Sequence, residues 1–269
     1  MTTTLLSGRR ALVTGSVQGI GLAMAVALAR AGGQVVLHGL ADATTHAAAR
    51  QAVAEAGGRP VQSMGHDLAD AAQVELLMHE VLAGGALDIL VNNAGIQHTA
   101  PLADMPRATW DTILAVNLSA AFHTMRLALP GMVARGYGRI VNVASVHGLV
   151  ASANKAPYVA AKFGLVGLTR VAALEAAQAG SRASGGVTAN CICPGWTETA
   201  IIEPQIVARA AQFGGERDAG IRDLLREKQP TGRTSTPDEI ARTLLWLCDP
   251  AAHNLTGAAI PVDGGWTAQ

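Results

Sequence analysis

The sequence predicts an α/β fold in which helices cover both faces of a doubly wound, parallel β-sheet. Short apolar runs typical of buried strands alternate with longer stretches whose apolar residues recur at helical spacing. A glycine-rich turn follows the first of these runs and opens the first helical stretch. Strands that alternate with helices favour parallel pairing with right-handed crossovers, because each helix carries the chain back across the sheet.

The individual elements follow from this alternation in chain order. We expect strands at residues 10–14, 34–38, 60–64, 87–91, 139–144, 187–192 and 258–262. Helices are expected at 20–30, 43–56, 71–82, 107–135, 157–178 and 237–248. The last helix has a clear start signal, with Thr236 as N-cap and Pro237 at the first helical position. Small, polar and glycine-rich residues from 179 to 186 predict a surface loop.

The segment 196–228 interrupts the regular pattern. It contains Pro204, the glycine pair Gly214 and Gly215, and a charged helical stretch. Such an insertion is expected to lie over the edge of the sheet, where a segment of this length often acts as a lid.

Composition narrows the class of protein. The chain has 269 residues, 49% of them hydrophobic, and its 20 basic residues balance 20 acidic ones. This balance argues against binding to nucleic acid or to an anionic membrane, so the expected partner is a small molecule. There is no apolar run of about 20 residues and no signal-peptide pattern, which favours the cytoplasm.

The cysteines and histidines predict neither disulfides nor a metal site. Cys191, Cys193 and Cys248 lie in apolar surroundings and are expected to be reduced core thiols. The eight histidines are scattered, without a pair or cluster at metal-ligand spacing. We therefore expect no protein-bound metal.

The glycine-rich turn predicts a dinucleotide site. Residues 14–21, Thr-Gly-Ser-Val-Gln-Gly-Ile-Gly, connect the first strand to the first helix, so backbone can approach a pyrophosphate at the positive end of that helix. A simple tight turn is the alternative. Asp67 and Leu68 after the third strand, and residues 92–95 after the fourth, add polar groups at the carboxyl edge where such sheets bind ligands.

Cofactor choice depends on the end of the second strand, where the sequence reads His38-Gly39-Leu40-Ala41-Asp42. His38 is the one basic residue in this turn, so nothing there resembles an arginine site for a 2′-phosphate. NAD is therefore expected over NADP. Asp42 is a candidate for the ribose hydroxyl only if the loop brings it close enough.

A tyrosine and a lysine four residues apart predict the reacting group. Tyr158 and Lys162 follow Pro157 and should leave the same helical face, so that the ammonium lowers the pKa of the phenol. The phenolate can then accept a proton from an alcohol. Ser145, after the fifth strand, can hydrogen-bond the reacting oxygen, and Asn117 can hold water in a proton path to Lys162. Taken alone, each of these residues is also compatible with an ordinary surface or loop position.

Taken together, these motifs resemble the short-chain dehydrogenase/reductase family. They occur in order over essentially the whole chain, from the glycine-rich turn through Asn117, Ser145, Tyr158 and Lys162 to Pro194-Gly195. The resemblance implies a Rossmann-type fold with about seven strands in one catalytic domain over 1–269, and a homotetramer. By motif and resemblance, the cofactor residues are Thr14, Gly15, Gln18, Gly19, Ile20, Gly21, Leu40, Asp67, Leu68, Asn93, Ala94, Gly95, Tyr158, Lys162, Pro194 and Gly195.

Longer stretches resemble one group within that family, the bacterial D-3-hydroxybutyrate dehydrogenases. These stretches are residues 93–98, 117–123, 145–150 and 263–266. The resemblance implies NAD-dependent, reversible oxidation of (R)-3-hydroxybutyrate to acetoacetate. It implies that the substrate is bound by Gln97, Ser145, His147, Lys155, Tyr158, Trp196, Gln205 and Trp266. A carboxylate substrate needs such polar donors at one end and apolar walls at the other.

Two other functions remain open on the sequence. One is a dehydrogenase or reductase for another alcohol, polyol or 3-oxoacyl substrate, because the fold accepts many substrates. The other is a protein that binds NAD without turnover. Leu40-Ala41 and the loop 179–186 depart from the group's pattern, and Trp266 is equally compatible with an oligomer contact.

Overall fold

A seven-stranded parallel sheet forms the centre of the computed structural model, which describes residues 5–57, 59 and 61–268. The strands are β1 (Arg10–Val13), β2 (Gln34–His38), β3 (Gln62–Met64), β4 (Ile89–Asn92), β5 (Tyr137–Val143), β6 (Gly186–Pro194) and β7 (Ala259–Val262). Their order is β3-β2-β1-β4-β5-β6-β7, and every neighbouring pair is parallel. The predicted fold class is confirmed. Pro60, the expected start of the third strand, lies outside the described residues.

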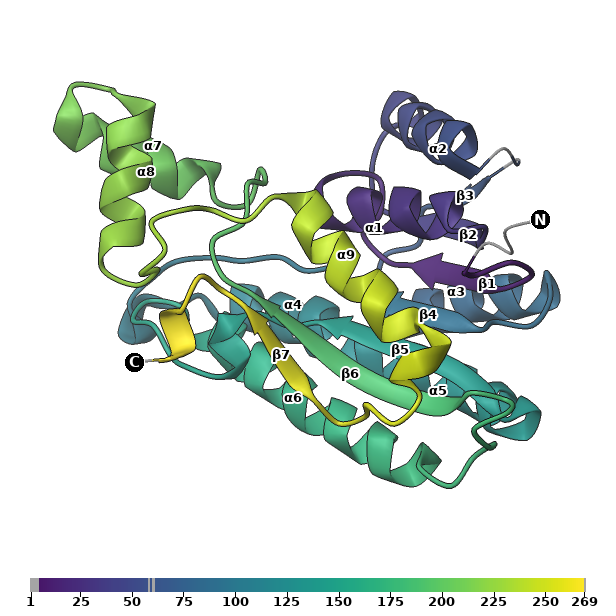
Figure 1. Ribbon diagram of the computed structural model, residues 1–269. Helices are drawn as coiled ribbons and strands as arrows, with labels where there is room; N and C mark the ends of the chain where they lie inside the picture. Colours follow the sequence, from purple (N-terminus) through teal and green to yellow (C-terminus); the bar gives the residue numbers. More distant parts are fainter. Residues whose placement is uncertain (1–4, 58, 60, 269) are drawn as a thin grey trace.

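Three helices cover one face of the sheet (Figure 1). They are α1 (Gly19–Arg30), α2 (Ala43–Gly57) and α9 (Pro237–Cys248). Met24 and Leu28 of α1 pack with Ile240 and Leu244 of α9 against β1, β4 and β5. Thr236 is the N-cap of α9, as predicted, and it also forms a capping box with Glu239.

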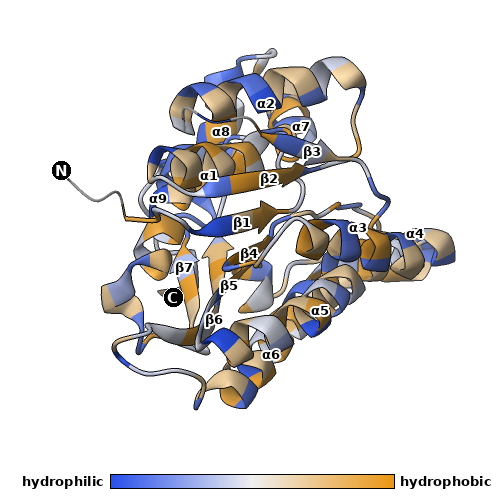
Figure 2. Cartoon of the chain, turned by 90° about the vertical axis from the view of Figure 1, so that its right-hand side faces the viewer, coloured by the Kyte–Doolittle hydropathy of each residue, from blue (hydrophilic) through white to orange (hydrophobic). Residues whose placement is uncertain are grey.

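The opposite face is covered by α3 (Ala71–Ala83), α4 (Arg107–Leu114), α5 (Ala120–Arg135) and α6 (Ala156–Ala176). Leu77 of α3, Met125 of α5 and Ala172 of α6 belong to the core on this side. Figure 2 shows the hydrophobic strands lying between the two helical layers. Cys191, Cys193 and Cys248 are free and buried, as predicted.

The helical stretch 107–135 is not a regular α-helix throughout. Residues Ala115–Ser119 form a π-helical turn, η2, between α4 and α5. By length and composition the whole stretch could cross a membrane, but it packs Met125, Ala128 and Met132 into the core. An inserted π turn is common at functional sites, and here it contains Asn117.

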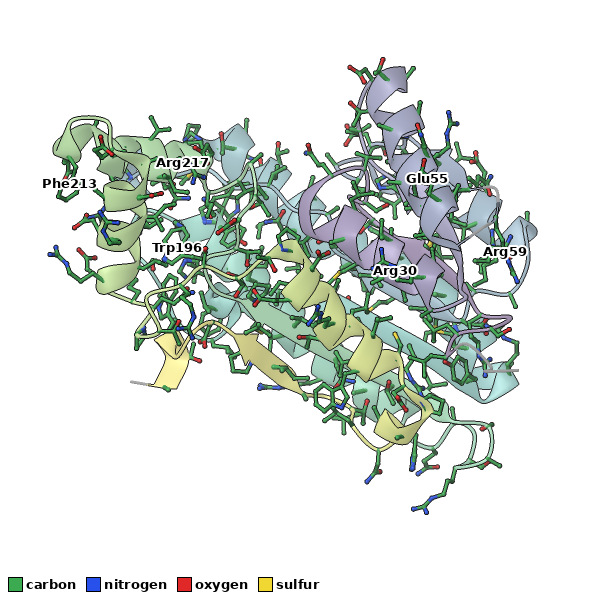
Figure 3. The ribbon with its side chains drawn as sticks, turned by 45° about the horizontal axis from the view of Figure 1, so that its top comes forward. Arg30, Glu55, Arg59, Trp196, Phe213 and Arg217 are labelled. Carbon is green, nitrogen blue, oxygen red and sulfur yellow. The ribbon has the colours of Figure 1, made fainter. Side chains whose placement is uncertain are left out.

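The segment 196–228 contains two helices that pack against each other, α7 (Glu203–Ala210) and α8 (Arg217–Arg226), joined by the short helix η4 (Ala211–Phe213). Figure 3 shows Trp196 near the base of this segment and Phe213 at its outer end. Its apolar side packs in a separate cluster that includes Ile206, Leu225 and both Trp196 and Trp266. The remaining short helices are η1 (Leu102–Asp104), η3 (Val146–Gly148), η5 (Pro250–Ala252) and η6 (Trp266–Ala268).

Candidate active site

A pocket of about 490 Å³ runs along the carboxyl edge of the sheet, between the strand ends and the α7–α8 segment. This is the edge at which open α/β sheets bind their ligands. The pocket brings together most of the residues that the sequence predicted. They are Gly15, Gln18, Gly19, Ile20, Gly21, Leu40, Asp67, Leu68, Asn93, Ala94, Gly95, Gln97, Ser145, His147, Lys155, Tyr158, Lys162, Pro194, Gly195, Trp196 and Trp266.

Three predicted residues lie just outside its wall. Thr14 and Asn117 line a second, much smaller cavity behind it. The hydroxyl of Thr14 accepts hydrogen bonds from the backbone N–H groups of Asn93 and Ala94, at 3.0 and 3.1 Å, and so shapes the wall from beneath. Gln205 on α7 reaches the site through its hydrogen bond with Lys155.

The glycine-rich turn has the shape that a dinucleotide requires. A Cβ at Gly21 would lie 2.2 Å from the carbonyl oxygen of Gly15, and a Cβ at Gly15 would lie 2.8 Å from Ala94 Cα. Side chains are therefore excluded at Gly15 and Gly21, where the backbone packs closely. No side chain caps the N-terminus of α1 at Gln18, so its first N–H groups remain available for a phosphate.

The end of β2 presents little charge to the pocket. Leu40 is 65% exposed and lines it, and His38 is buried beside it. Burial lowers the pKa of His38 to about 4, so its ring is neutral at physiological pH. Asp42 Oδ1 accepts a 2.7 Å hydrogen bond from the backbone of Thr45. Its carboxylate therefore caps the start of α2.

Tyr158 and Lys162 lie on one face of α6, with Lys162 Nζ 5.6 Å from the centroid of the Tyr158 ring. The expected drop in the pKa of Tyr158 is not seen. Burial raises the pKa of this phenol, and its hydrogen bond with Ser145 acts in the opposite direction. Lys162 is buried as well, and burial lowers its pKa to about 8. Its Nζ donates a 2.7 Å hydrogen bond to the carbonyl oxygen of Val143.

Ser145 and Asn117 are each fixed by backbone contacts. Ser145 begins η3, and its hydroxyl accepts a 3.1 Å hydrogen bond from the backbone of His147. The side chain of Asn117 exchanges two 2.9 Å hydrogen bonds with the backbone of Ile96. This pairing holds the π turn against the segment after β4, close to Lys162, since a Cβ at Gly95 would lie 3.5 Å from Asn117 Oδ1 and 3.7 Å from Lys162 Nζ.

Lys155 is a buried cation in the pocket wall. It is 7% exposed, and its Nζ donates a 3.3 Å hydrogen bond to Gln205 Oε1. In the part of the chain that the structure describes, no carboxylate forms an ion pair with it. Burial, followed by repulsion from Lys228, lowers its pKa to about 8. The preceding residue, Asn154, has a φ of 65°, a left-handed conformation that asparagine tolerates and that turns the chain into α6.

Aromatic rings surround the end of the pocket near Lys155. The rings of Trp196 and Trp266 lie 5.7 Å apart, and His147 meets Trp266 edge-on at 5.4 Å. His147 also meets the ring of Tyr158 edge-on at 6.0 Å. Burial and the charge of Lys155 lower the pKa of His147 to about 4, so it acts as a neutral hydrogen-bonding group.

Sequence reasoning missed several residues of the pocket wall. They include His66, Ile96, Val116, Thr197, Thr199 and Ile202. Thr197 and Thr199 directly follow Gly195-Trp196, and their position after a strand end was an available signal. Lys228 and Ser152 were also missed, because no sequence pattern relates them to the pocket that they approach.

Comparison with known proteins agrees with this geometry. A family model described as enoyl-(acyl carrier protein) reductase matches residues 15–267. D-beta-hydroxybutyrate dehydrogenase of Cupriavidus necator is 50% identical over 98% of this chain and 100% of its own length. The enzyme of that name from Rhizobium meliloti is 42% identical over 97% of this chain and 99% of its own length.

Solved structures give the same result. L-sorbose reductase from Gluconobacter frateurii, complexed with NADPH and L-sorbose, superposes with a TM-score of 0.91 at 28% identity, over all of both chains. Gluconate 5-dehydrogenase from Burkholderia cenocepacia, in complex with NADP and tartrate, superposes with a TM-score of 0.85 at 34% identity, over 99% of this chain and 98% of its own. The chain belongs to the short-chain dehydrogenase/reductase family.

Proposed function

We propose that this protein oxidises (R)-3-hydroxybutyrate to acetoacetate, reversibly, with NAD. The observation that carries the proposal is Lys155, a buried cation without a carboxylate partner among the described residues, in the same pocket as Ser145 and Tyr158. A buried charge is costly unless it is paired, so the carboxylate of the substrate is the expected counter-ion. The two relatives named as D-beta-hydroxybutyrate dehydrogenases support this choice.

The pocket residues divide between binding and proton transfer. Lys155, Gln205, Gln97 and His147 bind the carboxylate, and the rings of Trp196 and Trp266 exclude water from the rest of the substrate. Tyr158 removes the hydroxyl proton, and Ser145 donates a hydrogen bond to the same oxygen. The turn around Gly15 and Gly19 would hold NAD, which would supply the hydride acceptor for the carbinol carbon and a positive charge that favours the phenolate of Tyr158.

Lys162 and Asn117 support this proton transfer. Lys162 stabilises the phenolate from the same face of α6. Asn117, fixed on the π turn, lines the small cavity behind the pocket with Thr14. We infer that this cavity holds a water through which the proton leaves toward solvent.

NAD rather than NADP is the cofactor we propose. A ribose 2′-phosphate at the end of β2 would meet Leu40 and the neutral ring of His38 instead of a cation. Phosphate recognition needs a positive charge, which this turn does not supply. The carboxylate of Asp42 caps α2. The preference for NAD over NADP therefore comes from the lack of a cation at this turn and not from a carboxylate that binds the ribose.

The residues 196–228 are proposed to be the substrate lid. Gln205 on α7 contacts Lys155 directly, so α7 is positioned to respond to a carboxylate bound there. NAD would bind first along the carboxyl edge, and the substrate would follow before α7 and α8 close.

The experiment that tests this function is an initial-rate assay of NADH formation. The (R) and (S) acids are each offered with NAD and with NADP. Fast turnover of the (R) acid with NAD alone is the expected result. Turnover of a polyol or neutral alcohol, with none of either acid, would overturn the substrate assignment and leave the family intact.

We further propose a homotetramer in the cytoplasm. Apolar side chains on α5 and α6 are exposed in the single chain, among them Phe122, Phe163, Val171 and Leu174. Such side chains commonly become buried between subunits. Light scattering during gel filtration measures the assembly directly. The free, buried cysteines suit a reducing compartment.

A further inference from the structure

The chain has three lysines, of which two line the proposed site and the third lies beside it. They are Lys155, Lys162 and Lys228, while every other basic residue except histidine is an arginine. Lys162 and Lys155 already have assigned positions beside Tyr158 and in the carboxylate end of the pocket. Lys228, which lies two residues beyond the end of α8, does not line the pocket and has no role in the proton-transfer scheme.

Lys228 is held in place by the two elements that border the carboxylate end. Its Nζ donates a 2.9 Å hydrogen bond to Ser152 Oγ in the loop before α6. The same Nζ lies 5.3 Å from the centroid of the Trp266 ring. Lys155 has a matching position, with its Nζ 5.2 Å from the centroid of Trp196. The two neighbouring tryptophans therefore have a lysine beside each of them.

The backbone at Lys228 is anchored as well. The next residue, Gln229, is buried, and its Oε1 accepts a 3.0 Å hydrogen bond from the backbone of Trp196. Thr231 donates a backbone hydrogen bond of 3.1 Å to Gly264, in the segment that carries Trp266. The ammonium group of Lys228 is thus held close to Trp266, and the backbone beside Lys228 is bonded to the segments that carry Trp196 and Trp266.

The charge of Lys228 is not neutralised by the lid. Arg209, Arg217 and Arg226 of α7 and α8 each form an ion pair with an acidic residue of the lid. Among the described residues, no carboxylate forms an ion pair with Lys228. The ammonium groups of Lys155 and Lys228 thus border one end of the pocket without a carboxylate partner among the described residues. Both positive charges attract an anion that binds there.

We propose that Lys228 is a specificity-determining residue that acts across Trp266 as a second positive charge, favouring a carboxylate substrate over an uncharged one. This inference rests on the proposed function, because it assigns selectivity to the same pocket. Lys228 does not touch the reacting atoms. Its effect should therefore appear in KM for the acid, with kcat little changed.

The same charge sets the pH range in which Lys155 is effective. Apart from Lys228, the titratable groups near Lys155 are His147, whose lowered pKa keeps it neutral, and Tyr158, which lines the same pocket. Repulsion by Lys228 contributes to the lowered pKa of Lys155, after burial. Removing Lys228 should therefore weaken attraction for the acid at neutral pH, yet keep Lys155 protonated to higher pH.

The test compares Lys228→Met with three matched variants on (R)-3-hydroxybutyrate and its uncharged amide. Lys228→Arg keeps the charge, and Ser152→Ala removes the hydrogen bond while keeping the charge. Arg222→Met removes a cation from an exposed position on α8. In Lys228→Met we expect KM for the acid to rise roughly three- to tenfold at low salt, with kcat within about twofold and the amide unaffected.

Lys228→Arg and Arg222→Met should stay close to the unmodified enzyme. The ratio of kcat/KM for acid over amide should fall at higher pH in Lys228→Met than in the unmodified enzyme. Equal losses of kcat/KM for acid and amide, or the same rise in KM for the acid in Ser152→Ala, would show that Lys228 has only a structural role. An unchanged KM for the acid in Lys228→Met would also overturn the proposal.

Butyrate binding separates this inference from the proposed function. Trp196 and Trp266 report binding by fluorescence in the NAD-saturated protein, with butyramide as the uncharged control. If no hydroxy acid is oxidised, but butyrate binds and binds more weakly to Lys228→Met, the proposed function fails and this inference stands. If butyrate binds no better than butyramide, or equally well to both proteins, this inference fails.

Discussion

Lys155 Nζ donates a 3.3 Å hydrogen bond to Gln205 Oε1, which joins the start of α6 to the first helix of the proposed lid. The lysine belongs to the element that carries Tyr158, whereas the glutamine belongs to a segment that packs in its own apolar cluster. A carboxylate that binds Lys155 therefore meets a side chain of the lid at the same point. If Lys155 binds the substrate carboxylate, as we propose, this contact couples substrate binding to the position of α7.

The first prediction concerns Tyr158. Tyr158→Phe keeps the ring that packs edge-on with His147 but removes the proton acceptor. We expect kcat to fall by about three orders of magnitude, within the range typical of general acid–base groups, while the affinity for NADH stays within a few fold. Steady-state rates and NADH fluorescence titration measure the two effects. Near-normal turnover by this variant would assign the proton transfer to another group.

The second prediction concerns the pH dependence of substrate selection by Lys155. Its pKa is lowered to about 8 in the free protein, so the ammonium is present below that pH and lost above it. The ratio of kcat/KM for the acid over its amide should therefore decline above about pH 8. The ratio is needed because Lys162 also has a pKa of about 8 and affects both substrates. Lys155→Met should lower the ratio by roughly tenfold or more at pH 7 and remove its pH dependence.

The third prediction concerns acid stability. His38 and His147 are both buried, and each has a pKa lowered from 6.5 to about 4. An unfolded histidine takes up a proton near pH 6.5 that the folded one accepts only near pH 4, so stability falls as pH drops through this range. Each shift corresponds to roughly 3 kcal/mol at most. Urea unfolding between pH 7.5 and 5 measures the slope, and His147→Gln should reduce it. A slope unchanged in that variant would contradict the shift at His147.

The fourth prediction concerns cofactor choice at Leu40. Its side chain is 65% exposed at the end of β2, so an arginine can replace it without repacking the core. Leu40→Arg should lower KM for NADP by roughly tenfold, because it supplies a charged partner for the 2′-phosphate. Leu40→Gln is the uncharged control of extended shape. Equal effects of the two substitutions on NADP would argue against a charge-based preference.

The sequence predicted the sheet and its helices well because the central strands are short, fully buried runs. The burial of all four residues in both β1 and β4 is the physical basis of that signal. The proximity of Tyr158 and Lys162 was predictable for a different reason, because helical spacing alone places them on one face. The glycine-rich turn was predictable because its close backbone contacts at Gly15 and Gly21 exclude every larger residue.

Other features depend on tertiary contacts that no local pattern encodes. The π turn at Asn117 is held by paired hydrogen bonds to Ile96, 21 positions earlier in the chain. The direction of the pKa shift of Tyr158 was wrong in the sequence prediction, because spacing reveals the neighbouring cation but not the burial. The position of Asp42 in the sequence made it a candidate to bind the ribose hydroxyl. In the structure its carboxylate instead accepts a hydrogen bond from the backbone of Thr45 and caps α2.

The distribution of lysine also has a chemical consequence. An amine reacts with acylating and aldehyde reagents in its neutral form, and the two buried lysines have pKa values of about 8. Reagents small enough to enter the pocket should therefore modify lysine side chains at or beside the site and at no other place in the chain. Covalent labelling of this protein becomes a footprint of its pocket, and a bound ligand can be detected by the lysines that it protects.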